Sequence, residues 1–168
     1  MSDKIRVGIV MGSDNDWSVM QKCSMMLKDF GIGHEVRVIS AHRTPADAHE
    51  YATGAKDRGL EVLIGAAGMS AALSGVLAAN TTLPVIGVPI DSGPLVGIDA
   101  ALSTMQMPPG IPVACMAIGS AGARNAALYA AQILAGADPQ LAEKLVQFKK
   151  EQVDSVRKKD AALQQQIS

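Results

Sequence analysis

Short apolar stretches alternate with longer amphipathic stretches along most of the chain. The short stretches are rich in β-branched residues and have the length of buried strands. They are Ile5–Val10, Glu35–Ile39, Val62–Ala66, Pro84–Val88 and Val113–Ala117. Each of these stretches is followed by a segment in which apolar residues recur at helical spacing. The second of these segments is also preceded by Thr44-Pro45, a pair typical of a helix start. The predicted helices are Val19–Phe30, Pro45–Arg58, Ser70–Ala79, Leu95–Gln106 and Gly122–Leu134.

Five strand–helix alternations with short connections predict right-handed crossovers and one parallel sheet. We therefore expect an α/β fold: a three-layer, flavodoxin-like or Rossmann-like, doubly wound five-stranded sheet with an extra C-terminal helix. In such sheets ligands bind beyond the carboxyl ends of the strands. The loops that follow the strands are the places to look for chemistry.

The stretch from Asp138 onward lies outside this repeat. It carries many charges and a rough apolar stripe that includes Leu141, Phe148 and Val156. We expect residues 1–136 to form the α/β catalytic domain and residues 137–168 to form a helical arm. The arm either docks on a neighbouring subunit or packs on its own domain, and the stripe is compatible with both.

Composition excludes several classes of protein. The 168 residues are 48% apolar with a net charge of -1 and scattered basic residues, so we expect no nucleic-acid partner. The segment Val62–Ile90 has no charge, but Pro84 and Gly87 interrupt it, which favours buried strands and a helix over a membrane span. Cys23 and Cys115 lack metal-ligand spacing, so we expect two buried free thiols, no metal, and a reducing, cytoplasmic location without a secretory leader.

The first candidate loop, Met11–Asp16, reads MGSDND. Gly12 permits a sharp turn, and the helix that follows offers amides and a favourable dipole to a phosphate. Ser13 could add a hydroxyl, and Asp16 could hold a sugar hydroxyl. Asp14 and Asp16 could equally serve as helix N-cap residues.

The second candidate loop, Ser40–Pro45, reads SAHRTP. Arg43 suits a phosphate because its planar fork makes paired, charge-assisted hydrogen bonds. His42 can exchange a proton near neutral pH, which makes it the candidate general acid or base. We interpret His34, on a predicted turn, and His49, on a predicted helix, as surface residues.

The third candidate loop, Gly65–Ala72, is made mostly of small residues and includes Gly68, Met69, Ser70 and Ala71. Small residues at a strand end let a ligand lie against the backbone and could form a dry wall. The alternative interpretation is close packing of a helix on the sheet.

Together these segments resemble the PurE family, the 5-(carboxyamino)imidazole ribonucleotide mutases of purine biosynthesis. The matching motifs are MGSDND (11–16), SAHRTP (40–45), LPVIGVP (83–89), QMPPGIPVA (106–114) and NAALYAAQIL (125–134). The resemblance covers nearly all of the chain up to about Ala135.

The resemblance implies an isomerase that moves a carboxylate from the exocyclic nitrogen of the substrate to carbon 4 of its imidazole ring, without a cofactor. Aminoimidazole ribonucleotide and trapped carbon dioxide are the expected intermediates, with His42 shuttling the proton. A cytoplasmic homo-octamer with sites between subunits is implied as well. The implied substrate-binding residues are Ser13, Asp16, Ser40 and Arg43, and the pocket wall is Gly68, Met69, Ser70 and Ala71.

One motif departs from the family. Bacterial mutases usually read GGAAHLPG where this chain has residues 68–75, so Ala72 replaces a histidine and Ser74 replaces a proline. The last four residues of this motif, Ala72–Gly75, resemble a related branch of the family that carboxylates aminoimidazole ribonucleotide directly with carbon dioxide. Direct carboxylation therefore stays an alternative activity. A non-enzymatic, nucleotide-binding flavodoxin-like module is a second alternative. One such module, a phospho-receiver domain, needs an aspartate at the end of the third strand. This chain has Gly65 and Ala66 there, which argues against a phospho-receiver.

Overall fold

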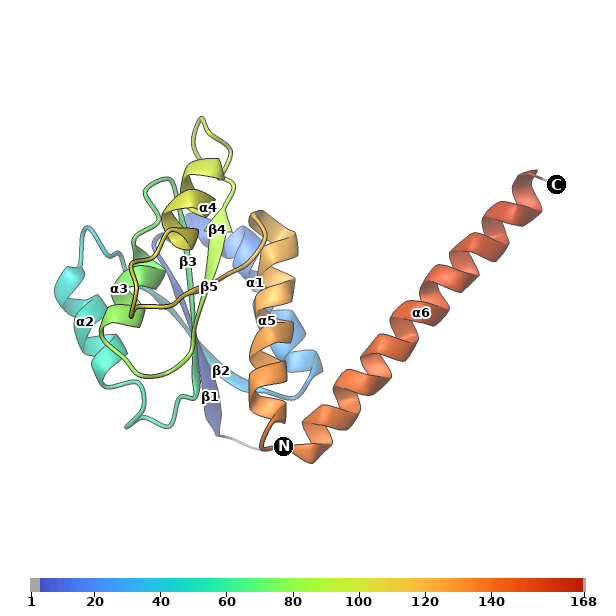
Figure 1. The fold of residues 1–168 in the computed structure, drawn as a ribbon, viewed down its shortest axis with the longest axis horizontal. Helices are drawn as coiled ribbons and strands as arrows, with labels where there is room; N and C mark the ends of the chain where they lie inside the picture. Colours follow the sequence, from blue (N-terminus) through green and yellow to red (C-terminus); the bar gives the residue numbers. More distant parts are fainter. Residues whose placement is uncertain (1–3, 168) are drawn as a thin grey trace. The chain divides into compact units, whose positions relative to one another are not determined.

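The computed structural model describes residues 4–167 and contains a five-stranded parallel sheet (Figure 1). The strand order is β2-β1-β3-β4-β5, and every neighbouring pair is parallel. The strands are β1 (Ile5–Met11), β2 (Gly33–Val38), β3 (Val62–Gly68), β4 (Val85–Ile90) and β5 (Ala114–Cys115). This order confirms the flavodoxin-like, doubly wound fold, in which the direction of winding reverses between β1 and β3.

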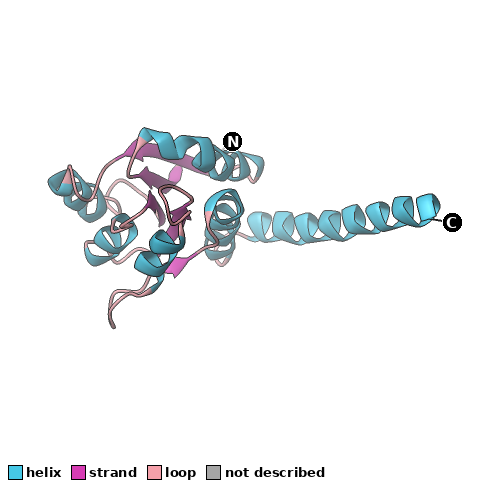
Figure 2. Ribbon diagram, turned by 90° about the horizontal axis from the view of Figure 1, so that it is seen from above, coloured by secondary structure: helices cyan, strands magenta, loops and turns pink. Residues whose placement is uncertain are grey.

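The chain forms two compact units, one up to Ala130 and one from Ala131 onward. The helical elements are η1 (Asp14–Asp16), α1 (Trp17–Asp29), α2 (Pro45–Thr53), α3 (Leu73–Ala79), α4 (Ile98–Met105), α5 (Gly119–Ala135) and α6 (Pro139–Ile167). In the first unit α2, α3 and α4 lie on one face of the sheet. The other face carries α1 and the part of α5 up to Ala130 (Figures 1 and 2).

Both faces of the sheet are covered by apolar side chains, as the continuous apolar strands predict. On the face of α2 and α3, Ala52 and Leu77 pack with Val10 and Leu63 of the strands. On the other face, α5 presents alanines that are fully buried, and their small size allows close approach to the sheet. These alanines are Ala123, Ala126, Ala127 and Ala130.

Three predicted helices are shorter than the sequence pattern indicated. The second ends at Thr53, and residues up to Gly59 continue as turns. The third begins at Leu73, after Met69 at a φ of 56°, and the fourth begins at Ile98, after Val96 at 50°. A left-handed residue cannot continue a right-handed helix, so Val96 and the left-handed Gly97 set where the fourth helix begins. Met69 lies before the predicted start of the third helix, so its conformation does not account for the later start at Leu73.

The uncharged segment from Val62 to Ile90 folds as β3, α3 and β4, which confirms two buried strands with a helix between them. Within residues 4–167, no helix has both the length and the apolar character needed to cross a bilayer.

A close contact between β1 and α2 depends on a glycine. A Cβ on Gly8 would overlap the hydroxyl oxygen of Tyr51. The Arg58 guanidinium lies 4.6 Å from the centre of the Tyr51 ring. Burial raises the pKa of Tyr51, and nearby Glu35 raises it further. The absence of a side chain at Gly8 thus lets the ring of Tyr51 lie against the sheet.

Candidate active site

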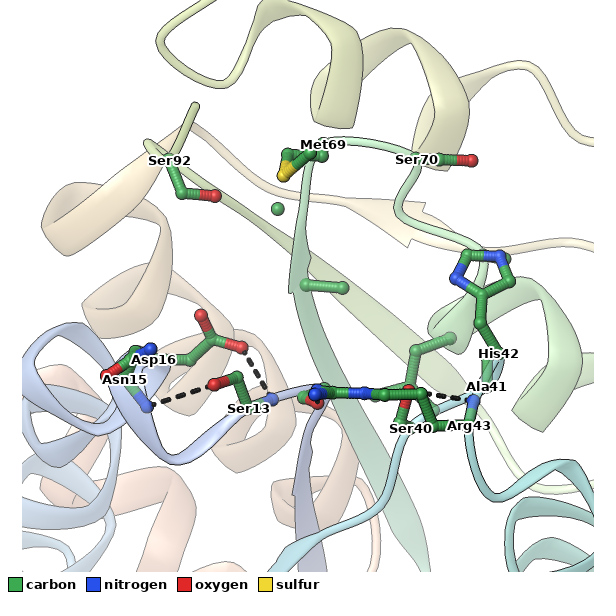
Figure 3. Close-up of a pocket in the computed structure, with 15 residues that line it drawn as sticks. Ser13, Asn15, Asp16, Ser40, Ala41, His42, Arg43, Met69, Ser70 and Ser92 are labelled. Atoms are coloured by element: carbon green, nitrogen blue, oxygen red, sulfur yellow. Dashed lines mark hydrogen bonds between the residues drawn. The ribbon is translucent and has the colours of Figure 1, made fainter. Parts of the chain in front are cut away.

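A pocket of about 530 Å³ lies at the carboxyl ends of β1, β2 and β3, where parallel sheets bind ligands (Figure 3). Its lining comes from the end of β3, from η1 and the loops after β1, β2 and β3, from the first residue of α3, and from the loop after β4. The lining residues are Gly12, Ser13, Asn15, Asp16, Ser40, Ala41, His42, Arg43, Ala67, Gly68, Met69, Ser70, Ala72, Leu73 and Ser92.

The first loop is held by a capping box around η1. The Ser13 amide donates to Oδ2 of Asp16 (3.1 Å), and the Asn15 amide donates to Oγ of Ser13 (3.3 Å). Ser13 is therefore the N-cap residue of η1. Asp16 occupies the N-cap position of α1, as the sequence suggested, but its side chain makes no capping hydrogen bond there. Asp14 is not an N-cap residue. Two amides expected to be open to a phosphate are already used, although the Ser13 hydroxyl still lines the pocket.

Asp16 is the buried carboxylate of the pocket, only 7% exposed. Burial raises its pKa, the hydrogen bond from the Ser13 amide lowers it, and the charge of Asp14 raises it. The Ser13 amide holds the carboxylate through Oδ2, at 3.1 Å. The carboxylate is thus fixed in place and can accept a hydrogen bond from a hydroxyl of a bound molecule.

The second loop is joined to the first through Arg43. Its Nη2 donates to the carbonyl oxygen of Gly12 (3.0 Å), and its Nε donates to Oγ of Ser40 (3.4 Å). Figure 3 shows the Arg43 side chain stretched across the pocket floor toward Ser13. The guanidinium and the serine hydroxyls form one polar, cationic end of the pocket, which can bind an anion such as a phosphate.

Thr44 occupies the N-cap position of α2 with Pro45 after it, as predicted, but its side chain does not cap the helix. Oγ1 of Thr44 accepts from the Ser40 amide (3.0 Å) and donates to the Ser40 carbonyl oxygen (3.1 Å). The threonine closes the loop on itself, which orients the three residues between Ser40 and Thr44.

His42 is exposed and lines the pocket opposite Asp16, with its ring turned toward the loop of Met69 and Ser70 (Figure 3). The other two imidazoles lie outside the pocket. His49 is exposed on α2, as expected, and its Nδ1 lies 2.7 Å from Oδ1 of Asn80. His34 lies in β2, not on a turn, and is half-buried with Nε2 2.7 Å from Oγ of Ser24.

The third loop contributes three of its four predicted residues. Gly68, Met69 and Ser70 line the pocket, whereas Ala71 is only 3% exposed and does not. Ala71 directly follows the turn and faces the interior. The pocket is not sealed, because Met69 is 55% exposed in the single chain.

The two departures from the family motif differ in their surroundings. Ala72 lines the pocket, so the missing imidazole changes the wall facing a ligand. Ser74 is buried in α3, where its Cα would lie 3.0 Å from a Cβ on Gly65. Ser74 thus belongs to helix–sheet packing. His42 is the one imidazole among the lining residues of the described chain.

Sequence reasoning did not single out Ser92, which reaches the pocket from the loop after β4. A Cβ on Gly68 would overlap its hydroxyl oxygen, so the two loops touch. The available signal was its position beyond the carboxyl end of a neighbouring strand. Asn15, Ala41, Ala67 and Leu73 also line the pocket and were named only as parts of loops or helices.

The thiols lie away from this chemistry. Cys23 and Cys115 are both free; Cys23 is buried as expected, whereas Cys115 is only half-buried. Burial raises the pKa of Cys23 to about 12, which keeps it protonated and unreactive. Among residues 4–167 no three His, Cys, Asp or Glu side chains are grouped as a metal site requires.

Sequence comparisons agree with this geometry. The AIR carboxylase family model matches residues 6–155. The N5-carboxyaminoimidazole ribonucleotide mutase of Mycobacterium leprae (strain TN) is 52% identical over 164 residues, covering 98% of this chain and 95% of the relative. The mutase of the same name from Pyrococcus abyssi (strain GE5 / Orsay) is 53% identical over 146 residues, covering 87% of this chain and 83% of the relative.

Solved structures give the same result. The crystal structure of Treponema denticola PurE has a TM-score of 0.83 at 31% identity, covering 94% of this chain and 97% of that one. A second crystal structure, of a substituted form of Treponema denticola PurE2, has a TM-score of 0.86 at 28% identity, covering 95% and 98%. The matches extend over nearly the whole chain, so this chain belongs to the AIR carboxylase (PurE) family.

Proposed function

We propose that this chain is a mutase that converts 5-(carboxyamino)imidazole ribonucleotide into 4-carboxy-5-aminoimidazole ribonucleotide, a step of purine biosynthesis. The observation that carries the proposal is the placement of His42 and Arg43 on one loop over a pocket that contains buried Asp16. The relatives named as mutases share about half of their residues with this chain, which supports the same activity.

In this proposal the cationic end of the pocket binds the phosphate. Arg43 and the hydroxyls of Ser13 and Ser40 supply the charge-assisted hydrogen bonds. Asp16 accepts from a ribose hydroxyl, a neutral donor that a carboxylate of raised pKa can accommodate. The imidazole ring of the substrate then lies toward His42 and the loop formed by Gly68, Met69 and Ser70.

The reaction exchanges one bond for another. The bond between the exocyclic nitrogen and the carboxylate carbon breaks, its electrons stay on nitrogen, and nitrogen gains a proton as carbon dioxide forms. Carbon 4 of the ring then attacks carbon dioxide, and the proton on carbon 4 leaves. His42 can take that proton and return one to nitrogen, so no proton is lost over the cycle and no cofactor is needed.

We further propose a homo-octamer whose neighbouring subunits complete the site. The pocket of a single chain is open on the side of Met69 and Ser70, both exposed, whereas free carbon dioxide must be confined to react. Exposed apolar residues on and before α4 include Val96, Ile98 and Leu102, and burial of this patch against another subunit would be favourable. A cytoplasmic location accords with the two unpaired thiols.

We also propose that residues 1–136 act as the catalytic domain and that residues 137–168 serve as an arm that docks on another subunit. The exposed apolar residues of α6 recur at seven-, three-, seven- and four-residue intervals. They are Val146, Val153, Val156, Leu163 and Ile167. Such spacing forms one stripe along a helix and is typical of helices that pack lengthwise on a partner helix.

The activity is tested by one assay with two substrates. The enzyme is offered 5-(carboxyamino)imidazole ribonucleotide, and separately aminoimidazole ribonucleotide with bicarbonate, and kcat/KM is compared. The proposal predicts a strong preference for the carboxyamino compound. A preference for the second pair would instead assign direct carboxylation, and no turnover of either would leave only binding.

A further inference from the structure

Met69 has a backbone conformation that its side chain disfavours. Its φ is 56°, in the left-handed region, and Met69 and Val96 are the two non-glycine residues with positive φ in the described chain. The Met69 side chain lines the pocket and is 55% exposed, so burial in the core does not explain this conformation. A non-glycine residue held in this region at a pocket is often functional.

Contacts with the loop after β4 hold Met69 in this position. A Cβ on Gly93 would lie 3.1 Å from Cγ and 3.7 Å from Sδ of Met69, and Gly93 has a φ of 74°. One residue earlier in each loop, the glycine and the side chain change places. Gly68 has no side chain, and the Ser92 hydroxyl occupies the space that a Cβ at Gly68 would fill. The two loops therefore interlock through two glycines, and Figure 3 shows Met69 and Ser92 on the same rim of the pocket.

We propose that the Met69 thioether is a retaining wall for carbon dioxide and that Gly93 is the positioning residue that holds this wall in place. The inference rests on the proposed mutase activity and goes beyond it by assigning retention to two named residues. Carbon dioxide has no charge, so an apolar wall that delays its escape is the available means of holding it.

The wall acts at one point of the reaction. After the nitrogen–carbon bond has broken, carbon dioxide is either captured by carbon 4 or lost to water. Capture yields the carboxylated product, and loss leaves aminoimidazole ribonucleotide with its new proton on nitrogen. Met69 changes the ratio of these two outcomes without touching the phosphate, which Arg43 binds at the other end of the pocket.

The experiment follows substrate labelled with ¹³C in its carboxylate. The amounts of aminoimidazole ribonucleotide and of labelled product are measured per turnover, and the spontaneous loss in an enzyme-free sample is subtracted. Met69→Gly removes the side chain and also relieves the backbone, so it should fold. We expect it to raise the ratio of aminoimidazole ribonucleotide to product about tenfold, equivalent to about 1.4 kcal/mol.

A matched pair of glycine variants tests the role of Gly93. Gly93→Ala and Gly59→Ala both place alanine at positive φ, but at Gly59 the new Cβ would meet only Cε of Lys4, at 3.9 Å. Gly93→Ala should raise the ratio and Gly59→Ala should not. Because Gly93 acts through Met69, Gly93→Ala should add nothing further in the Met69→Gly background.

The outcomes separate this inference from the proposed function. If the wild type converts the carboxyamino compound but Met69→Gly keeps the wild-type ratio, the retaining wall is refuted and the mutase activity stands. A Gly93→Ala effect of equal size with and without the Met69 side chain would refute the positioning role. A wild type that converts no carboxyamino compound would refute the proposed function itself.

Discussion

The guanidinium of Arg43 donates a 3.0 Å hydrogen bond from Nη2 to the carbonyl oxygen of Gly12, residues 31 positions apart in the chain. This bond ties the loop after β2 to the loop after β1, and the Nε bond to Ser40 fixes the direction of the side chain. The cation is therefore held in place before a ligand arrives, which lowers the entropic cost of binding.

Replacing Arg43 by Lys should weaken substrate binding more than it slows chemistry. An ammonium group lacks the planar fork needed to contact Gly12, Ser40 and a phosphate together. Loss of one charge-assisted hydrogen bond predicts an increase in KM of about 10- to 100-fold with a smaller change in kcat. Steady-state kinetics measure both values. Arg37→Lys, at an exposed position of β2 that does not line the pocket, serves as the control.

Replacing Asp16 by Asn should stabilise the fold while impairing binding. Because burial raises the pKa of Asp16, the folded protein keeps its proton to a higher pH than the unfolded chain does. Stability therefore falls as pH rises from the ordinary pKa of 3.8 to the higher folded value, and the loss persists above it. Asn still accepts from the Ser13 amide but carries no charge, so the variant should lack this decrease.

Thermal unfolding of wild type and Asp16→Asn at pH values from 3 to 8 measures this difference. The Tm advantage of the variant should be absent at the acidic end and grow with pH. An advantage that shrinks as pH rises would contradict the assignment. KM should increase at neutral pH, because a neutral amide is the weaker acceptor for a ribose hydroxyl.

Most of the fold and the site was predictable from the sequence because strand–helix alternation determines which loops share a sheet edge. The loops of Ser13, His42 and Met69 were expected to meet on that ground, and the structure places all three around one pocket. The start of α4 was less predictable, because the left-handed conformation of Val96 depends on packing that the local sequence pattern does not encode.

Other details that could not be predicted from the sequence also depend on packing and turn geometry. Ala71 lies between the pocket-lining residues Ser70 and Ala72, and only the turn geometry shows that it is buried. Ser92 lacks a motif of its own and reaches the pocket because Gly68 leaves room for it. The capping role of Ser13 likewise depends on a turn in which Asp16 bends back to the Ser13 amide.

Gly8→Ala should destabilise the protein through Tyr51. The new methyl group would overlap the Tyr51 hydroxyl in a fully packed layer, and such overpacking costs about 1–3 kcal/mol. Denaturant unfolding measures the loss. Tyr51→Phe removes the overlapping oxygen, so the double variant should regain stability relative to Gly8→Ala; an undiminished loss would show that the clash lies elsewhere.

Introducing a charge into the α6 stripe should reduce the size of the assembly. Val153→Arg and Val156→Arg place a guanidinium on the exposed apolar face, where a docked partner would have to bury it. Ser155→Arg adds the same charge at an exposed position outside the stripe and serves as the control. Light scattering after size exclusion should give a smaller mass for the first two variants only; equal masses for all three would contradict the docking role.

The proton-transfer role of the His42 imidazole is tested most directly in the variant His42→Asn. Substrate affinity and turnover are measured in the same preparation of this variant. Asparagine keeps a polar side chain but cannot exchange a proton at neutral pH. Calorimetry should give unchanged affinity, while kcat should fall about 10²- to 10⁴-fold, the usual contribution of a positioned acid or base. Turnover close to wild type would contradict the central claim that His42 moves the proton.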